Sequence, residues 1–236
     1  MTTLFISDLH LEESRPDITG AFLDFLKNRA MGVEALYILG DFFEAWIGDD
    51  ENTPLQQQVA EALREVRDSG TRIFLMHGNR DFLLGNDYCS RFDGTLLEDP
   101  TVIDLYGTPS LLMHGDSLCT ADVEYQKFRA RMRDPQMQKM MLARPLAERQ
   151  LMARQLREMS MAKNQGKEEY IMDVTPEEVV KEMEAHGVQR MIHGHTHRPA
   201  VHDLEAGGKP AKRIVLGDWD SHVWWLEAGP DLEPQL

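Results

Sequence analysis

The sequence predicts an α/β fold with a layered core and one helical insertion. Short apolar runs rich in branched residues end in Gly, Asp or His, and stretches with helical spacing lie between the first of them. One long segment lacks the strand pattern altogether. With 236 residues, of which 42% are hydrophobic, the chain can bury one large core, so we expect one domain with an insertion rather than two equal domains.

Six apolar runs have the length and composition of buried strands. They are Thr3 to Ile6, Ala35 to Leu39, Arg72 to Met76, Ser110 to Met113, Arg190 to Ile192 and Arg213 to Leu216. Between the first three lie two stretches in which apolar residues recur on one helical face, Ile18 to Ala30 and Leu55 to Val66. Alternation of strand and helix is typical of a stacked α/β core. We expect the tail from Gly229 to Leu236 to be frayed.

The segment from Asp122 to Glu169 differs from the rest of the chain. It is helical in composition and holds seven of the 14 methionines. Between Lys127 and Lys167, eleven Lys or Arg stand against three acidic residues, a local charge of +8 in a chain whose formal net charge is -15. We therefore expect a helical lid insertion over 122–169, between core segments 1–121 and 170–236. Pro176, followed by two glutamates, predicts the helix start at which the core resumes.

Composition also argues against several functions and compartments. The net charge of -15 argues against a broad nucleic-acid-binding face, which needs clustered Lys and Arg. Cys89 and Cys119 are thirty residues apart, in no metal-ligand or redox spacing, so we expect a reducing cytosol. The charged residues Asp8 and His10 follow too soon after Met1 for a signal peptide, and no eighteen apolar residues run together. Membrane contact is expected to be peripheral.

Five fragments at the ends of predicted strands carry side chains that ligate metals. They are Asp8-Leu9-His10, Gly40-Asp41, Gly78-Asn79-Arg80-Asp81, His114-Gly115-Asp116 and Gly194-His195-Thr196-His197. In open α/β sheets, ligands bind outside the carboxyl ends of the strands, so the fragments can converge. Asp41, on a tight turn, is suited to bridging two cations. Asp8 and His10 are two residues apart, so an extended backbone would direct both side chains toward one ion, and His195 and His197 share this spacing.

Each fragment alone carries little weight. An aspartate at a strand end is more often a turn residue or a helix cap than a ligand, and His114 alone is compatible with a core histidine. Asn79 beside a glycine is compatible with an ordinary turn. All five fragments in this order, each after a strand, favour a site for two metal ions.

The ordered set D-x-H, GD, GN-R/H-D/E, HGD and GHTH spans residues 8 to 197 and resembles the signature of the calcineurin-like metallophosphoesterases. The resemblance implies a core of stacked sheets flanked by helices, and two metal ions per chain. It implies a first ion held by Asp8, His10, Asp41 and His197, and a second held by Asp41, Asn79, His114 and His195. Nitrogen and oxygen ligands without a thiolate suit manganese and tolerate iron or zinc, and the resemblance favours manganese.

Arg80 distinguishes this chain from many members of that superfamily, in which a histidine at this place can protonate a departing alkoxide. Arginine does not give up a proton at neutral pH. The replacement therefore favours a leaving group that is already stable as an anion, such as a phosphate of a diphosphate. We expect Arg80 to neutralise substrate oxygens, and the alternative is a surface arginine paired with Asp81.

Arg80, the strings ILGDFFEAWIGDD (38–50) and GNRDFLL (78–84) and the helical insertion together resemble the family of UDP-2,3-diacylglucosamine diphosphatases of lipid A biosynthesis. The resemblance implies that water activated by two metal ions attacks the α-phosphorus, giving UMP and 2,3-diacylglucosamine 1-phosphate. It implies catalytic roles for Asp41, Asn79, Arg80 and His195. It implies substrate contacts by Asn79, Arg80, Asp122, Ser160, Asn164, Lys167 and His195. Independently, the spacing of four and three between Ser160, Asn164 and Lys167 would place them on one helical face. An ordinary solvated polar face is the alternative.

The apolar side of the lid allows two interpretations. Its residues can pack on the core or can line a groove for the two acyl chains of the substrate, which the resemblance favours. They are Met132, Met137, Met140, Met141, Leu142, Leu146, Leu151, Met152 and Leu156. Interleaved Arg and Lys favour anionic headgroups, so we expect peripheral attachment through the lid to the cytoplasmic face of the inner membrane. We expect no nucleic acid and no obligate protein partner.

Two other functions remain open at this stage. A phosphoesterase of the same superfamily could act on a soluble substrate, such as a dinucleoside polyphosphate or a cyclic nucleotide, and the apolar lid argues against it. A non-catalytic scaffold could keep the fold and bind partner proteins. Such scaffolds usually lose ligands, whereas here every expected ligand position is filled.

Overall fold

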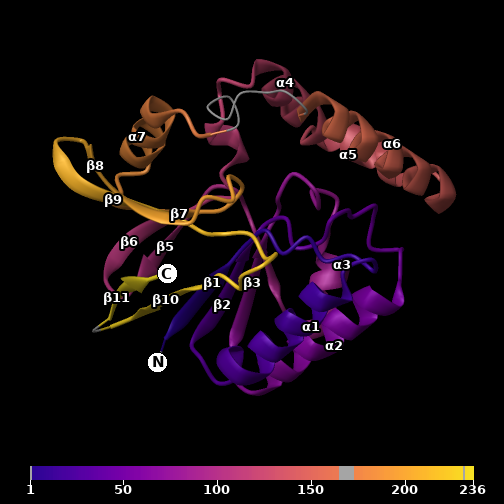
Figure 1. Cartoon of the computed structure of the whole chain (residues 1–236), viewed down its shortest axis with the longest axis horizontal. Coiled ribbons are helices and arrows are strands. Elements are labelled where there is room, and N and C mark those ends of the chain that lie inside the picture. Colours follow the sequence, from indigo (N-terminus) through magenta and orange to yellow (C-terminus); the bar gives the residue numbers. More distant parts are fainter. Residues whose placement is uncertain (1, 165–172, 231) are drawn as a thin grey trace.

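A computed structural model describes residues 2–164, 173–230 and 232–236 (Figure 1). The first half of the chain contains β1 (Thr3–Ile6), α1 (Pro16–Phe25), the π-helical turn η1 (Leu26–Ala30), β2 (Ala35–Leu39), α2 (Pro54–Asp68), β3 (Arg72–Met76), α3 (Asn86–Cys89), the 3-10 turn η2 (Ser90–Phe92), β4 (Thr95–Leu97), β5 (Thr101–Leu105), β6 (Thr108–Leu112) and the 3-10 turn η3 (Asp116–Leu118). The second half contains α4 (Val123–Met132), α5 (Pro135–Leu142), α6 (Leu146–Asn164), α7 (Pro176–Ala185), β7 (Arg190–His193), β8 (Ala200–Ala206), β9 (Lys209–Val215), β10 (Leu226–Gly229) and β11 (Leu232–Gln235).

Two sheets form the centre of the molecule. The first has the strand order β11-β10-β1-β2-β3-β4 and the second has the order β5-β6-β7-β9-β8. Strands β1 to β4 are parallel to one another, as are β6, β7 and β9. The carboxyl ends of parallel strands meet at one edge of a sheet, so the loops after β1, β2 and β3 gather at one edge and those after β6 and β7 at another.

Alternating side chains build the layers, because successive residues of a strand point to opposite faces. In β1, Leu4 and Ile6 pack in one cluster with Phe22 of α1 and Val59 of α2. Phe5, between them, packs in a second cluster with residues of both sheets. A third cluster joins the outer face of the second sheet to α7. Figure 1 shows α1 and α2 on one flank and α7 on the other, so the predicted core of stacked sheets flanked by helices is confirmed.

The first three predicted strands have the observed bounds, and the other three are shifted by a few residues. The prediction of a frayed tail is wrong, because β11 pairs antiparallel with β10 and extends the first sheet. Strands β4 and β10 are short and β8 is largely exposed, so none of these three produced a clear apolar run. Strand β9 was predicted only at its end, from Arg213. The predicted helix from Ile18 ends as an α-helix at Phe25 and continues as η1 to Ala30.

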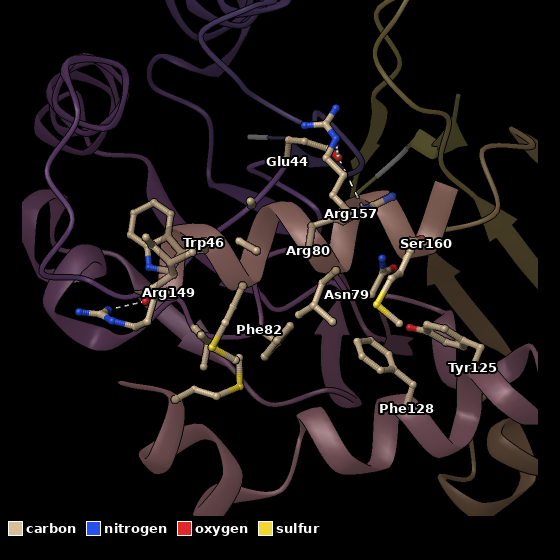
Figure 2. Close-up of a pocket in the computed structure, with 18 of the residues that line it drawn as sticks. Glu44, Trp46, Asn79, Arg80, Phe82, Tyr125, Phe128, Arg149, Arg157 and Ser160 are labelled. Carbon is tan, nitrogen blue, oxygen red and sulfur yellow. Dashed lines mark hydrogen bonds and ion pairs between the residues drawn. The ribbon is translucent and has the colours of Figure 1, made fainter. Parts of the chain in front are cut away.

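Helices α4, α5 and α6 follow one another after Asp122, and α4 is fixed to the core through the buried carboxylate of Asp116. That carboxylate accepts hydrogen bonds from the Tyr125 hydroxyl at 2.7 Å and from Arg129 Nε at 2.9 Å. Helix α6 places Arg149, Arg157 and Ser160 along the pocket drawn in Figure 2. Among the helices described, none is long and apolar enough to cross a membrane.

Candidate metal centre and substrate pocket

The ligand-bearing fragments lie in the loops that follow β1, β2, β3, β6 and β7, and backbone hydrogen bonds join these loops to one another. The amide of Asp8 donates to Gly40 O at 3.1 Å, and the amide of His10 donates to Asp41 O at 2.9 Å. On the other sheet, the amide of Gly194 donates to His114 O at 2.9 Å. The loops therefore support one another as a connected layer above the strands.

The predicted extended backbone between Asp8 and His10 is wrong. Both residues have left-handed φ values, 55° and 49°, and the same conformation occurs at Asp41, His195 and His197. Residues other than glycine adopt this region at a cost, and Asp and His tolerate it better than branched residues do. The side chains converge because each loop turns sharply after its strand, and not because the backbone stays extended.

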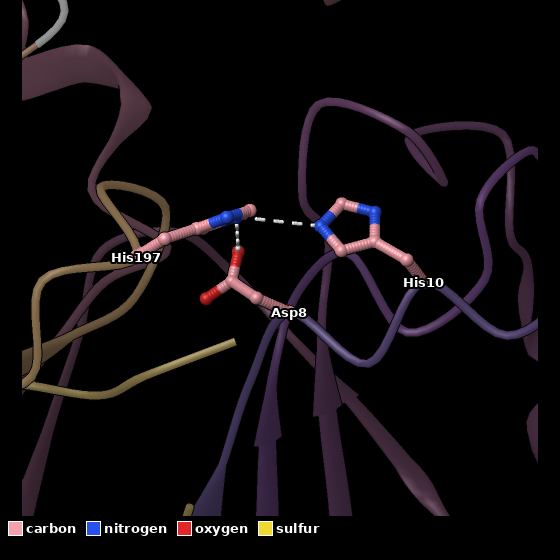
Figure 3. A group of neighbouring side chains, drawn as sticks. All are labelled: Asp8, His10 and His197. Carbon is pink, nitrogen blue, oxygen red and sulfur yellow. Dashed lines mark hydrogen bonds and ion pairs between the residues drawn. The ribbon is translucent and has the colours of Figure 1, made fainter. Parts of the chain in front are cut away.

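Asp8, His10 and His197 form one group able to hold a cation (Figure 3). His197 Nε2 lies 3.5 Å from Asp8 Oδ1 and 3.4 Å from His10 Nε2. Asp8 is buried, whereas His10 is partly exposed and His197 is exposed. Two imidazole nitrogens and one carboxylate oxygen facing a shared point are a ligand set suited to a transition metal.

Asp8, Asp41 and His114 form a second such group, and Asp41 extends between the two. Its Oδ1 lies 3.7 Å from His114 Nε2, and its Oδ2 lies 3.8 Å from His10 Nε2. Asn79 Oδ1 lies 3.0 Å from His114 Nε2, and the ring of His195 lies 5.1 Å from the His114 ring. The structure thus brings all seven side chains named as metal ligands into one cluster, with Asp41 between its two halves.

The residues present fit a cation, and the oxygens of Asp8 give the reason. Asp8 Oδ2 accepts hydrogen bonds from the Ser7 hydroxyl and from the His195 amide, the latter at 2.9 Å. Asp8 Oδ1 is buried and receives no hydrogen bond from any described residue. Its nearest partner is the imidazole nitrogen of His197 at 3.5 Å, so this buried oxygen is poorly satisfied, and a metal ion at the centre of the group would satisfy it.

Two glycines let the motif loops approach this closely. A Cβ at Gly78 would lie 2.1 Å from Asp41 Oδ1, and a Cβ at Gly194 would lie 2.2 Å from Asp8 Oδ2. Neither carboxylate could keep its place beside a larger residue. Gly78 and Gly194 are therefore required for the geometry of the site.

The titration of the cluster reflects burial and mutual charge. Burial lowers the pKa of His114, but the charges of Asp41 and Asp8 outweigh it and raise the pKa to about 9. Burial lowers the pKa of His197, but the contacts with Asp218 and Asp8 outweigh it and raise the pKa to about 10. Burial and the nearby His114 lower the pKa of His195 to about 4, so this imidazole is neutral at pH 7.

Two carboxylates beside the cluster carried no ligand spacing in the sequence and were not predicted. Glu44 Oε2 lies 2.9 Å from His10 Nδ1, and Asp218 Oδ2 lies 3.4 Å from His197 Nδ1. Each faces the histidine nitrogen that points away from the cluster. Burial raises the pKa of Glu44, but the contact with His10 and the charge of Arg80 outweigh it, so the pKa is lowered. Glu44 is therefore ionised.

A pocket opens beside the cluster and runs between the core loops and the helices α4 to α6 (Figure 2). It encloses about 1170 Å³, its open mouth included. Its polar end is formed by Asn79, Arg80, Glu44, Tyr125, Arg157 and Ser160. The rest of the lining is mainly apolar, with Arg149 and Glu124 as its charged members. Its apolar residues include Trp46, Ile47, Phe82, Leu83, Phe128, Met141, Met152 and Leu156. The pocket is therefore amphiphilic, with its polar end toward the cluster.

The predicted substrate residues of the lid have different places. Ser160 lines the pocket, whereas Asp122 caps α4 by accepting a hydrogen bond from the Tyr125 amide at 3.1 Å. Asn164 is the last residue of α6, and its side chain lies outside what the structure describes. Lys167 lies outside the described residues. Tyr125, whose ring stacks on His195 at 6.1 Å, was not predicted because nothing in its spacing distinguishes it.

The apolar residues of α4 to α6 divide between the core, the pocket and the surface. Met132 and Met137 pack against the core cluster, whereas Leu156 lines the pocket. Met141 and Met152 do both. Met140, Leu142 and Leu151 are exposed instead.

Helix α6 is held to the core by two arginines. Arg149, only 5% exposed, donates to Ile47 O and forms an ion pair with Asp50. Arg157 lies 3.0 Å from Glu12 and 3.4 Å from Glu44. The wall of the pocket therefore depends on charged contacts in the first turn of the helix and beyond its middle.

Comparisons with known proteins agree with this geometry. The family model of the calcineurin-like phosphoesterases matches residues 1–199. A UDP-2,3-diacylglucosamine hydrolase of Marinobacter nauticus is 81% identical over 97% of this chain and 93% of that protein. Proteins of the same name from Cellvibrio japonicus and Pseudomonas aeruginosa are 59% and 60% identical, over 97% and 96% of this chain and 95% of each relative. The chain therefore belongs to the calcineurin-like phosphoesterases and, within them, to the family of UDP-2,3-diacylglucosamine hydrolases.

Proposed function

We propose that this metal-dependent hydrolase cleaves the diphosphate of UDP-2,3-diacylglucosamine to UMP and 2,3-diacylglucosamine 1-phosphate, a step of lipid A biosynthesis. The names of the relatives supply the substrate. The observation that carries the proposal is the amphiphilic pocket, whose polar end adjoins a cluster of metal ligands and whose wall is apolar. A diphosphate at the cluster would leave acyl chains along that wall.

The metal centre is proposed to hold two Mn²⁺ ions. Asp8, His10, Asp41 and His197 would hold the first, and Asp41, Asn79, His114 and His195 the second. The oxygens of Asp41 face His10 and His114 from opposite ends of one carboxylate, which supports its bridging role. Divalent ions at this cluster would supply an activated water and positive charge for the phosphate oxygens. Nitrogen and oxygen ligands without a thiolate suit manganese and tolerate iron or zinc, and the resemblance to the family favours manganese.

The polar end of the pocket is proposed to bind and orient the diphosphate. Arg80 Nε is buried without a hydrogen-bond partner among the described residues, so a phosphate oxygen would satisfy it. His195, neutral at pH 7, can donate one ring N–H to the reacting phosphoryl group without carrying charge. Asn79 would orient the same group. Attack at the α-phosphorus breaks its bond to the bridging oxygen, which leaves with the sugar phosphate as an anion.

Helices α4 to α6 are proposed to be a lid, inserted as 122–169 between the core segments 1–121 and 170–236. Asp122, Ser160, Asn164 and Lys167 would contact the substrate from this side. Met140, Leu142, Leu151 and Met159 are exposed apolar residues of α5 and α6, with Lys and Arg between them. Such a surface would attach peripherally to the anionic cytoplasmic face of an inner membrane and give the lipid substrate a short path to the pocket.

A substrate comparison in ¹⁸O-labelled water tests the proposal. The manganese-loaded chain should hydrolyse the diacylated UDP-sugar far faster than UDP-N-acetylglucosamine, and mass spectrometry should find the label in UMP. Label in the sugar phosphate would place the attack at the other phosphorus. Equal turnover of both substrates would contradict the role of the apolar wall and favour a soluble diphosphate as substrate. Membrane attachment is tested separately, by flotation with vesicles that contain anionic lipid or lack it.

A further inference from the structure

Glu44 stands where the metal cluster, Arg80 and helix α6 meet. Its Oε2 lies 2.9 Å from His10 Nδ1, and its Oε1 lies 3.6 Å from Arg80 Nη1 and 3.4 Å from Arg157 Nε. The side chain is 11% exposed. Figure 2 shows Glu44 and Arg157 together at the polar end of the pocket. One carboxylate therefore contacts a candidate metal ligand and two cations at once.

The orientation of His10 depends on which ring nitrogen holds its proton. His10 Nε2 faces the cluster, 3.8 Å from Asp41 Oδ2 and 3.4 Å from His197 Nε2. Only a nitrogen without a proton can bind a metal ion, so the proton of the neutral ring has to stay on Nδ1. The carboxylate of Glu44 lies 2.9 Å from that nitrogen, as an ion pair without the alignment of a hydrogen bond, and its negative charge favours the proton there.

We propose that Glu44 is a positioning residue, which fixes the proton of His10 on Nδ1 and presents Nε2 to the first metal ion. Carboxylates that contact a ligating histidine orient the ring and make it a stronger ligand. The negative charge of the same carboxylate offsets the positive charges of Arg80 and Arg157, and so reduces their repulsion of the metal ion. This inference rests on the proposed assignment of His10 as a metal ligand.

Glu12 offers a matched control. It contacts Arg157 Nη1 at 3.0 Å, and among the described residues no hydrogen bond or ion pair joins its side chain to His10. Replacing Glu12 disturbs the attachment of α6 while leaving the pair of Glu44 and His10 in place. A difference between variants at the two positions therefore separates an effect on His10 from an effect on the helix.

The test measures metal binding directly, by calorimetric titration of Mn²⁺ into the full chain after treatment with a chelator. Glu44→Ala should weaken the binding of one ion by roughly 10- to 100-fold and leave the second unchanged. Glu44→Gln keeps an acceptor but loses the charge, so its loss should be smaller. Glu12→Gln should bind both ions as the unaltered chain does. With diamagnetic Zn²⁺ in place of Mn²⁺, long-range ¹H–¹⁵N spectra should show the Nδ1–H form of His10 in the unaltered chain and its loss in Glu44→Ala.

Four outcomes separate the possibilities. Unaltered Mn²⁺ affinity in both Glu44 variants would overturn the inference, as would an equal loss in Glu12→Gln, which would place the effect on α6. If Glu44→Ala does not fold, the Mn²⁺ affinity of Glu44→Gln tests the inference, and a smaller loss of affinity is expected for that variant. Failure of the unaltered chain to bind any divalent ion would instead overturn the proposed function itself.

Discussion

The backbone amide of His195 donates a hydrogen bond to Asp8 Oδ2 at 2.9 Å and thereby joins two residues 187 positions apart. The contact ties the end of the first sheet to the end of the second. It also occupies one oxygen of Asp8 and leaves the other, buried and without a hydrogen bond, 3.5 Å from His197 Nε2 in the cluster. The D-x-H motif and the GHTH motif, the first and last of the five, therefore belong to the same site.

Asp41→Ala should abolish both metal binding and hydrolysis, because Asp41 stands between the two halves of the cluster. Elemental analysis after purification should find about two ions per chain before the substitution and close to none after it. Asp203→Ala, at an exposed position of β8, serves as the control and should keep both ions. Full activity of Asp41→Ala in added manganese would refute the bridging role.

Gly194→Ala should disrupt the metal site, since the new methyl group would lie 2.2 Å from Asp8 Oδ2. Mn²⁺ affinity should fall more than tenfold, measured by titration of the chelator-treated chain. Gly20, exposed in α1, is the control, because beyond its own helical turn a methyl group there would meet no atom within 4 Å. Gly20→Ala should raise the free energy of unfolding by about 0.5 to 1 kcal/mol and leave metal binding alone. Similar Mn²⁺ affinities in the two variants would contradict this account of Gly194.

Arg129→Met should destabilise the fold. Arg129 lies 2.9 Å from Asp116 and 3.5 Å from Asp99, and both carboxylates have buried oxygens without hydrogen bonds. Removing the arginine leaves these carboxylates poorly compensated, so the free energy of unfolding in urea should fall by about 3 kcal/mol. Lys127→Met, two residues away, breaks only an exposed ion pair with Glu124 and should change little. Equal unfolding midpoints for the two variants would argue against the anchoring of α4 by Asp116.

Metal binding should tighten as the pH rises. The pKa of His114 is raised to about 9 and that of His197 to about 10, so both are protonated in the metal-free chain at pH 7. A metal ion needs the neutral rings and has to displace these protons, so affinity should increase by about tenfold per pH unit for each proton displaced, up to those pKa values. Titrations of Mn²⁺ between pH 6.5 and 8.5, in buffers of different ionisation enthalpy, measure both the trend and the protons released. An affinity that does not vary with pH would show that these rings are already neutral.

The metal ligands could be predicted from the sequence because each follows an apolar strand, and the ends of parallel strands meet in space. Glu44 and Asp218 could not, since their contacts with His10 and His197 arise from how separate loops fold together. The spacing of residues along the sequence does not predict contacts of this kind.

The strands with continuous apolar runs, such as Ala35–Leu39, are buried on both faces and were predicted with their observed bounds. The hairpin of β8 and β9 was predicted only in part, because its exposed positions are polar and its apolar signal is interrupted. The left-handed turns at Asp8 and His10 gave no signal either, because neither position holds the glycine that usually marks such a conformation.

A left-handed backbone conformation at five ligand positions favours activity and lowers thermal stability. The positions are Asp8, His10, Asp41, His195 and His197. Each such residue costs roughly 1 to 3 kcal/mol that glycine would not incur. A library of variants screened only for thermal tolerance without metal should therefore accumulate glycine at these five positions, whereas a screen for turnover should purge it. The metal ions that this site is proposed to hold would be what makes the costly backbone worth keeping.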